Sequence, residues 1–212
     1  GGVFMSAFVI TLLGAESTGK TTLAHRLGAA LAARGERVAV VEEYLREFCV
    51  REARMPLVHE QRLIAAEQTR RIAAAAASHD VVVADTSALM IAVYSDHVFG
   101  DTSLYEEALA AHARADLTLL TALDLPWQAD GPIRDGPHVR EPVDAKVRAA
   151  LARAALAWAV LFGQGEARLD NALAAVERAR NPADRDDGRP RWQWVCERCG
   201  EAGCERHRLP PL

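Results

Sequence analysis

The chain has 212 residues, of which 50% are hydrophobic and 25% are charged, and its formal net charge is −4. These values indicate a soluble globular domain with a short appendage, and they argue against a generic nucleic-acid binder. The longest apolar stretch, residues 154–163, has about half the length of a membrane span, which excludes a transmembrane helix. No secretory signal opens the sequence and the four cysteines form no disulfide framework, so we expect a reducing, cytoplasmic setting.

Apolar, β-branched runs alternate with helical patterns along most of the chain. Residues 8–13 (FVITLL) predict a strand buried on both faces, and residues 20–34 then predict an amphipathic helix. Further strands are expected at 37–41, 81–84, 117–121 and 158–162, with helices at 43–51, 58–78, 88–98, 103–114, 143–155 and from 166 to about 180. The alternation indicates parallel βαβ units and hence an α/β fold whose open sheet is covered on both faces.

Residues 14–21 (GAESTGKT) match the pattern G-x-x-x-x-G-K-[ST] of a phosphate-binding loop. Glycines let the backbone wrap tightly so that its N–H groups point at phosphate oxygens. The lysine supplies a positive charge to the β- and γ-phosphates, and the hydroxyl of Thr21 is suited to Mg²⁺. We therefore predict that a nucleoside triphosphate is bound by Gly14, Ala15, Glu16, Ser17, Thr18, Gly19, Lys20, Thr21 and Thr22.

Asp85 ends the third apolar run, where enzymes with such a loop commonly carry a second carboxylate linked to Mg²⁺. The segment from Asp85 to Ser87 is also suited to cap the helix that begins at Ala88, and the two roles are compatible. In a phosphoryl transfer, Asp85 either accepts the proton of the acceptor hydroxyl or holds Mg²⁺, and the sequence leaves both roles open.

Four segments in this order resemble the ribosylnicotinamide kinase domain of the NadR family over about residues 8–180. They are the loop GAESTGKTTL, then Glu43-Tyr44-x-Arg46, then Asp85-Thr86 with Val93-Tyr94 and Phe99-Gly100, and finally Pro126-Trp127-x-x-Asp130-Gly131 with Arg134. The resemblance implies a three-layer P-loop kinase fold with a five-stranded parallel sheet in the strand order 2-3-1-4-5. It also implies ATP- and Mg²⁺-dependent phosphorylation of the 5′-hydroxyl of nicotinamide riboside, which gives nicotinamide mononucleotide in NAD biosynthesis.

The same segments supply candidate catalytic and acceptor-binding residues. We expect catalytic roles for Lys20, Asp85 and Arg134, and acceptor contacts from Glu43, Tyr44, Arg46, Tyr94, Trp127 and Asp130. Several alternatives stay open: Glu43 either binds a ribose or starts a helix, and Arg46 binds either phosphate or Glu43. Trp127 either stacks on a nicotinamide ring or anchors its loop. The loop over residues 125–142 is long enough to be a lid that also carries Arg140.

The chain departs from this family at both ends. It begins close to the phosphate-binding loop, so we expect a stand-alone kinase without the adenylyltransferase and DNA-binding domains of bifunctional members. We expect a disordered start over 1–7, the kinase domain over 8–180, a linker over 181–191 and a separate tail over 192–212. Alternative functions are a kinase for another nucleoside or small metabolite, and a nucleotide-sensing ATPase whose tail binds a protein or nucleic acid.

The tail contains Cys196, Cys199, Cys204 and His207 within twelve residues. Three thiolates and an imidazole suit tetrahedral Zn²⁺, so we predict a small structural site similar to a zinc knuckle. The alternative is a disordered tail whose cysteines are incidental. We expect Cys49 to lie in the core, a nucleoside as the small-molecule partner and no membrane partner; a homo-oligomer is compatible with the sequence.

Overall fold

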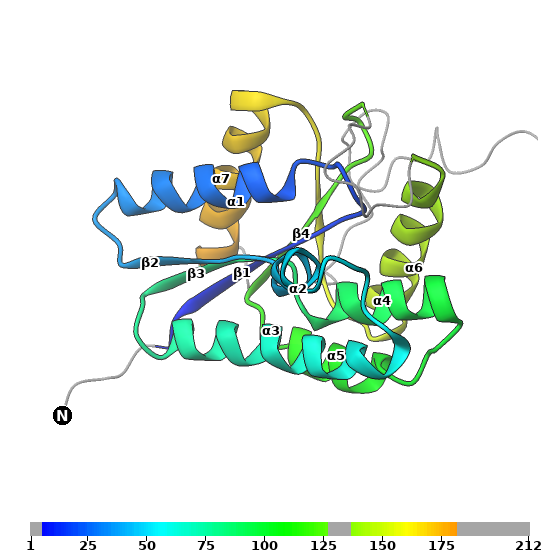
Figure 1. The fold of residues 1–212 in the computed structure, drawn as a ribbon. Helices are drawn as coiled ribbons and strands as arrows, with labels where there is room; N and C mark the ends of the chain where they lie inside the picture. The colour runs from blue at the N-terminus through cyan, green and yellow to red at the C-terminus, as the bar shows by residue number, and fades with distance from the viewer. Residues whose placement is uncertain (1–5, 127–136, 182–212) are drawn as a thin grey trace, which may run out of the picture.

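The computed structural model describes residues 6–126 and 137–181. Its centre is a parallel sheet of five strands in the order β2-β3-β1-β4-β5 (Figure 1), which confirms the predicted topology. The strands are β1 (Phe8–Leu13), β2 (Val38–Val41), β3 (Val81–Asp85), β4 (Leu117–Thr121) and β5 (Ala159–Leu161).

Helices cover both faces of the sheet. They are α1 (Lys20–Ala32), α2 (Tyr44–Glu52), α3 (Gln61–Ala76), α4 (Ala88–Phe99), α5 (Tyr105–His112), α6 (Arg140–Arg153) and α7 (Gly165–Arg180), with short 3₁₀ helices η1 (Val58–Glu60) and η2 (Pro137–Val139). In Figure 1, α1 and α7 lie on one side of the sheet and α3, α4 and α5 on the other. Within the described residues, no helix combines the length and apolar character needed to cross a membrane.

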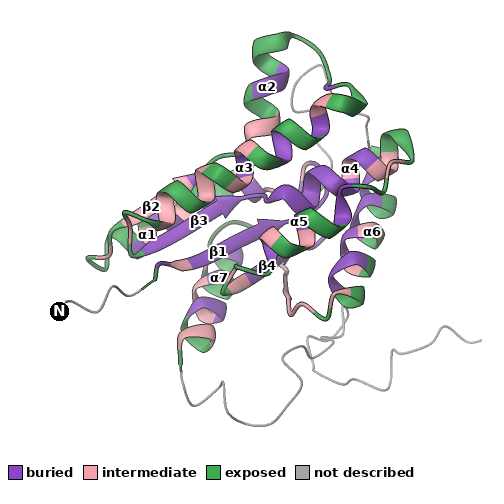
Figure 2. Cartoon of the chain, turned by 90° about the horizontal axis from the view of Figure 1, so that it is seen from below, coloured by how far each residue is buried: buried purple, intermediate pink, exposed green. Residues whose placement is uncertain are grey.

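The central strands are buried on both sides, which explains their uninterrupted apolar sequences. On β1, Ile10 and Leu12 pack with residues of α1 and α7, whereas Leu13 packs with residues of α3, α4 and α6. Helix α4 lies among α3, α5 and α6, and every residue from Ala88 to Val93 is buried, as Figure 2 shows. Because this first half of α4 has no face toward water, its sequence is apolar all round, whereas polar residues and the exposed Val98 and Phe99 occupy the second half.

The helix predicted at 143–155 is wrong at its start, because α6 begins at Arg140. The connection predicted over 125–142 is therefore shorter at its C-terminal end. Pro142 occupies the third position of α6, where a backbone N–H has no partner within the helix and proline is tolerated. The helix predicted at 58–78 is divided into η1 and α3, and the remaining elements begin and end within two residues of their predicted limits.

A buried histidine links α5 to the sheet. His112 is 3% exposed; its Nδ1 lies 2.9 Å from Ser87 Oγ and its Nε2 lies 2.9 Å from Thr118 Oγ1. Burial lowers the pKa of this imidazole from 6.5 to about 4, because the charged form would lose its hydration. The neutral ring therefore ties the end of α5 to Ser87, which caps α4 two residues after Asp85.

We expect acid to destabilise the fold through His112. The unfolded chain binds the proton at the ordinary pKa, so the stabilisation is complete above about pH 6.5 and is lost as the pH falls toward 4. At pH 5 the loss is about 2 kcal/mol of unfolding free energy. Urea unfolding at pH 7 and pH 5 should show this loss in the wild type and in the exposed control His59→Gln, but not in His112→Gln. Equal pH dependence in all three proteins would contradict the prediction.

Candidate active site

The phosphate-binding loop connects the carboxyl end of β1 to the start of α1. Its backbone is left-handed at Ser17 (φ 54°) and Gly19 (φ 77°), which curls the loop around its own centre. The Thr18 hydroxyl donates a hydrogen bond of 2.7 Å to the carbonyl of Ala15, and Thr121 of β4 donates one of 2.6 Å to the Thr18 hydroxyl. The neighbouring strand therefore holds the loop in this shape.

Gly14 is required by its surroundings as well as by its backbone conformation. Its φ is 153°, and a Cβ at this position would lie 2.0 Å from Thr121 Oγ1. Atoms cannot approach this closely, so any side chain would push the loop away from β4.

We therefore expect Gly14→Ala to impair nucleotide binding. A displacement of about 1 Å in a site of this kind costs about a hundredfold in activity, and we expect the affinity for nucleotide to fall by a comparable factor. Isothermal titration with ADP measures the effect on binding. The matched control is Gly35→Ala, which also has a left-handed φ (89°) but meets no atom within 4 Å. Equal ADP affinity in the two variants would contradict the steric argument.

The Lys20 side chain lies inside the loop. Its Nζ donates hydrogen bonds of 2.8 Å to the carbonyl of Gly14 and 3.2 Å to that of Ala15, and the residue is 9% exposed. Helix α1 begins at Lys20 with Gly19 as its N-cap, and no side chain caps it. The ammonium group and the positive end of the helix dipole therefore face the same space, as binding of an anion requires.

Asp85 lies beside this loop because β1 and β3 are neighbours, with Leu12 paired to Asp85 in register. Thr21 Oγ1 donates a hydrogen bond of 2.6 Å to Asp85 Oδ2. Asp85 Oδ1 is buried and has no hydrogen-bond partner among the described residues. The helix-cap role falls to Ser87, whose Oγ accepts from the N–H of Leu89 at 3.2 Å. The two residues predicted to hold Mg²⁺ are thus in direct contact.

The backbone between Asp85 and Ser87 is strained. Thr86 has a φ of 81°, which is rare for a β-branched residue, although it is 1% exposed and well enclosed. Gln68 of α3 is fully buried; its Nε2 lies 3.5 Å from the carbonyl of Thr86 and 3.3 Å from that of Glu42, and its Oε1 accepts from the Tyr44 N–H at 2.8 Å. Gln68 therefore positions the ends of both β2 and β3. This role could not be predicted from the sequence, because a glutamine is an ordinary residue within a helical pattern.

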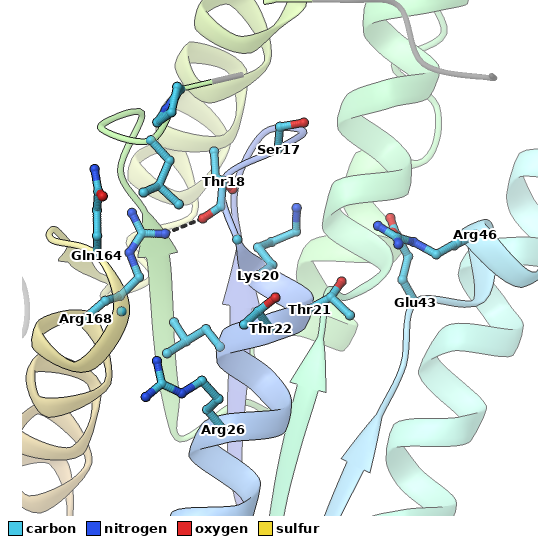
Figure 3. A pocket seen from close by; sticks show the side chains of 15 residues that line it. Ser17, Thr18, Lys20, Thr21, Thr22, Arg26, Glu43, Arg46, Gln164 and Arg168 are labelled. Atoms are coloured by element: carbon cyan, nitrogen blue, oxygen red, sulfur yellow. Dashed lines mark hydrogen bonds and ion pairs between the residues drawn. The ribbon is translucent and has the colours of Figure 1, made fainter. Parts of the chain in front are cut away.

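A cavity of about 630 Å³ opens over the loop (Figure 3). Its lining residues come from four segments: the loop with α1, the start of α2, the first part of the connection after β4 and the start of α7. They are Ser17, Thr18, Gly19, Lys20, Thr21, Thr22, Leu23, Arg26, Glu43, Arg46, Leu125, Pro126, Gln164, Gly165 and Arg168. Glu43 and Arg46 form an ion pair of 3.9 Å and both face this cavity, so the predicted helical pair exists at the site itself.

A family model described as an AAA domain matches residues 9–168. The chain belongs to this AAA-domain family. No curated protein matches the sequence. A crystal structure of the NadR protein in complex with NR is similar, with a TM-score of 0.68 and 22% identity over 82% of this chain and 50% of that one. A thymidylate kinase from Ehrlichia chaffeensis has a TM-score of 0.58 and 14% identity over 80% of this chain and 99% of that one.

These likenesses establish that this AAA-domain chain has the fold of P-loop kinases. The chain spans half the length of the NadR chain that it matches.

The residues around Asp85 fit a magnesium ion. Mg²⁺ is usually held through one or two carboxylates together with substrate phosphates and water. Thr21 and Asp85 supply a hydroxyl and a carboxylate in contact, and the buried Asp85 Oδ1 has no other partner in the described residues. Within those residues, no group of three or more His, Cys, Asp or Glu side chains is arranged to hold a metal ion.

The remaining predicted residues are separated from this cavity or lie outside the described part. Tyr44 packs on the core and lies under Arg71, whose Cζ is 4.4 Å from the ring centre. Tyr94 of α4 also packs on the core, and neither tyrosine lines the cavity. The predicted residues outside the described ones are Trp127, Asp130, Arg134, Cys196, Cys199, Cys204 and His207. Cys49 is buried, as expected.

Proposed function

We propose that the chain is an ATP- and Mg²⁺-dependent kinase that phosphorylates the 5′-hydroxyl of nicotinamide riboside to nicotinamide mononucleotide. The observation that carries the proposal is that the phosphate-binding loop and, opposite it, Glu43 and Arg46 line the same cavity. Such an arrangement offers a triphosphate site and, beside it, polar groups for a second substrate. The resemblance of four sequence segments to ribosylnicotinamide kinases and the fold likeness to a NadR structure with NR support this acceptor.

The chemistry asks mainly for positioning and charge neutralisation. A bond forms between the acceptor oxygen and the γ-phosphorus, the bond from that phosphorus to ADP breaks, and the proton of the acceptor hydroxyl passes to water. Lys20 and the first turn of α1 hold the phosphates. Thr21 and Asp85 would hold Mg²⁺, which when bound neutralises charge on the β- and γ-phosphates. Glu43 would accept a hydrogen bond from a ribose hydroxyl, and its 3.9 Å ion pair with Arg46 would fix the orientation of its carboxylate.

Mass spectrometry of a reaction with ATP, Mg²⁺ and nicotinamide riboside tests the proposal, with Lys20→Ala as the control. We expect the mononucleotide only with intact Lys20. A wild-type protein that binds ATP but forms no mononucleotide would reject this acceptor, and a panel of nucleosides would then identify another. ADP release measured without any acceptor separates a kinase, which should release little, from a nucleotide-sensing ATPase.

A further inference from the structure

Arg168 joins three segments that are far apart in the sequence. It lies in the first turn of α7 and is 3% exposed. Its Nε donates to the carbonyl of Gly163 at 2.8 Å, its Nη2 pairs with Asp124 Oδ1, and its Nη1 donates to the carbonyl of Thr18. Asp124 Oδ2 also accepts from the N–H of Gly163 at 2.6 Å. The guanidinium therefore connects the loops after β4 and β5 to the phosphate-binding loop, as Figure 3 shows for Thr18.

The bond to Thr18 has a consequence for the next peptide group. In a planar trans peptide, the carbonyl and the following N–H point in opposite directions. Because Arg168 holds the Thr18 carbonyl on the side of α7, the N–H of Gly19 is turned away from Arg168. Lys20, whose ammonium group lies inside the loop, follows directly after this N–H. A reversed peptide would direct a carbonyl oxygen at a phosphate.

The surroundings of Arg168 show how closely it is fitted to the loop. A Cβ on Gly19 would lie 3.3 Å from Arg168 Nη1 and 3.0 Å from Leu125 Cδ1, so these side chains fill the space behind the loop. A cation in the first turn of a helix opposes the helix dipole, and burial lowers the pKa of this guanidinium. The stability of the helix therefore does not favour arginine at this position. Its contacts with Asp124, Gly163 and Thr18 favour it.

We propose that Arg168 is a positioning residue that sets the Thr18–Gly19 peptide for phosphate binding and couples it to the β5–α7 loop. The inference rests on the proposed function, because it assumes that the loop binds a nucleotide. Arg168 acts through the backbone of the loop, so its substitution should weaken the binding of ligands that carry phosphates and should have little effect on the binding of the base.

The test compares the affinities for ADP and adenosine by isothermal titration. The variants are Arg168→Ala and Arg168→Lys. Lysine keeps the positive charge, but its donors all lie on one nitrogen and cannot replace the planar fork whose three nitrogens reach three segments. If Arg168→Ala unfolds, a double variant, Arg168→Gln with Asp124→Asn, takes its place. It removes both charges together, so that no carboxylate is left without its partner. The control is Arg34→Ala, which removes an exposed ion pair between the turn after α1 and helix α7, Arg34 with Glu177. Thermal unfolding shows which variants are folded.

We expect every folded Arg168 variant to lose ADP affinity about tenfold or more while adenosine affinity changes less than about threefold, with little restoration by lysine. In steady-state assays the KM for ATP should rise and kcat should fall, whereas Arg34→Ala should behave like the wild type. Equal losses for ADP and adenosine, or unchanged ADP affinity in the folded variants, would overturn this role while leaving the proposed kinase intact. A wild-type chain that binds no ADP would overturn both.

Discussion

Lys20→Ala is expected to reduce phosphoryl transfer about a thousandfold, because a single preorganised charge in a sheltered site is worth this much to a transition state. The ammonium group is 2.8 Å from the carbonyl of Gly14, inside the loop, and it faces the same space as the positive end of α1. Steady-state kinetics with ATP and the accepted nucleoside measures the loss. We expect the effect on kcat to exceed the effect on the KM for ATP, since charge develops as the phosphoryl group moves.

The control for this variant is Lys146→Ala. Lys20 and Lys146 are the only lysines in the sequence, and Lys146 lies on α6, where it pairs with Asp96 at 2.8 Å. Its removal should leave catalysis at the wild-type rate. The same pair allows a test without mutation: amine acetylation followed by mass spectrometry should show ATP protecting Lys20 but not Lys146. Equal activity of the two alanine variants would refute the assigned role of Lys20.

The fold and the phosphate-binding half of the site could be predicted from the sequence because both depend on local patterns. Apolar runs that are buried on both faces identify the strands, and the loop between Gly14 and Thr21 has a spacing that its backbone geometry demands. Asp85 was also predictable, because the last residue of a buried strand next to β1 must lie at the same edge of the sheet.

The residues that hold the site in place were not predictable, because their partners are distant in the sequence. Gln68 is one polar residue among many on helical surfaces until α3 packs over β2 and β3 and brings this side chain to their carboxyl ends. Arg168 meets Thr18 across 150 residues, and only the parallel sheet brings their segments together. Its one sequence signal was a cation in the first turn of a helix, where the dipole disfavours it.

The residues predicted to contact an acceptor reach the cavity only in part. Glu43 and Arg46 face the cavity, whereas Tyr44 between them faces the core. On a helix, neighbouring residues point about 100° apart, so a contiguous motif cannot turn all of its side chains to one ligand. Residues three apart can do so, and the 3.9 Å ion pair reflects this spacing. A match over consecutive residues therefore identifies the segment that lies at the site better than it identifies the individual residues that face the cavity.

Asp85→Asn is expected to lower kcat/KM by about two to three orders of magnitude, with the loss concentrated in metal binding. Asparagine has a similar shape but no charge, so the Thr21 contact is retained while the carboxylate that suits Mg²⁺ is removed. The direct Thr21–Asp85 contact favours this role over that of a general base. The Mg²⁺ concentration for half-maximal activity should then rise at least about tenfold.

A Mg²⁺ titration at several pH values separates the two roles. A metal-holding Asp85 predicts partial recovery of activity at high Mg²⁺ and an unchanged pH profile. A general base predicts no recovery and the loss of the acidic limb of the profile, because no carboxylate is left to titrate. Asp80→Asn is the matched control: Asp80 lies just before the opposite end of β3 and pairs with Arg37 at 2.7 Å, so its change should affect stability alone. An Asp85→Asn enzyme with wild-type Mg²⁺ dependence would contradict the metal role, since removing a carboxylate ligand must weaken the hold on a hard cation.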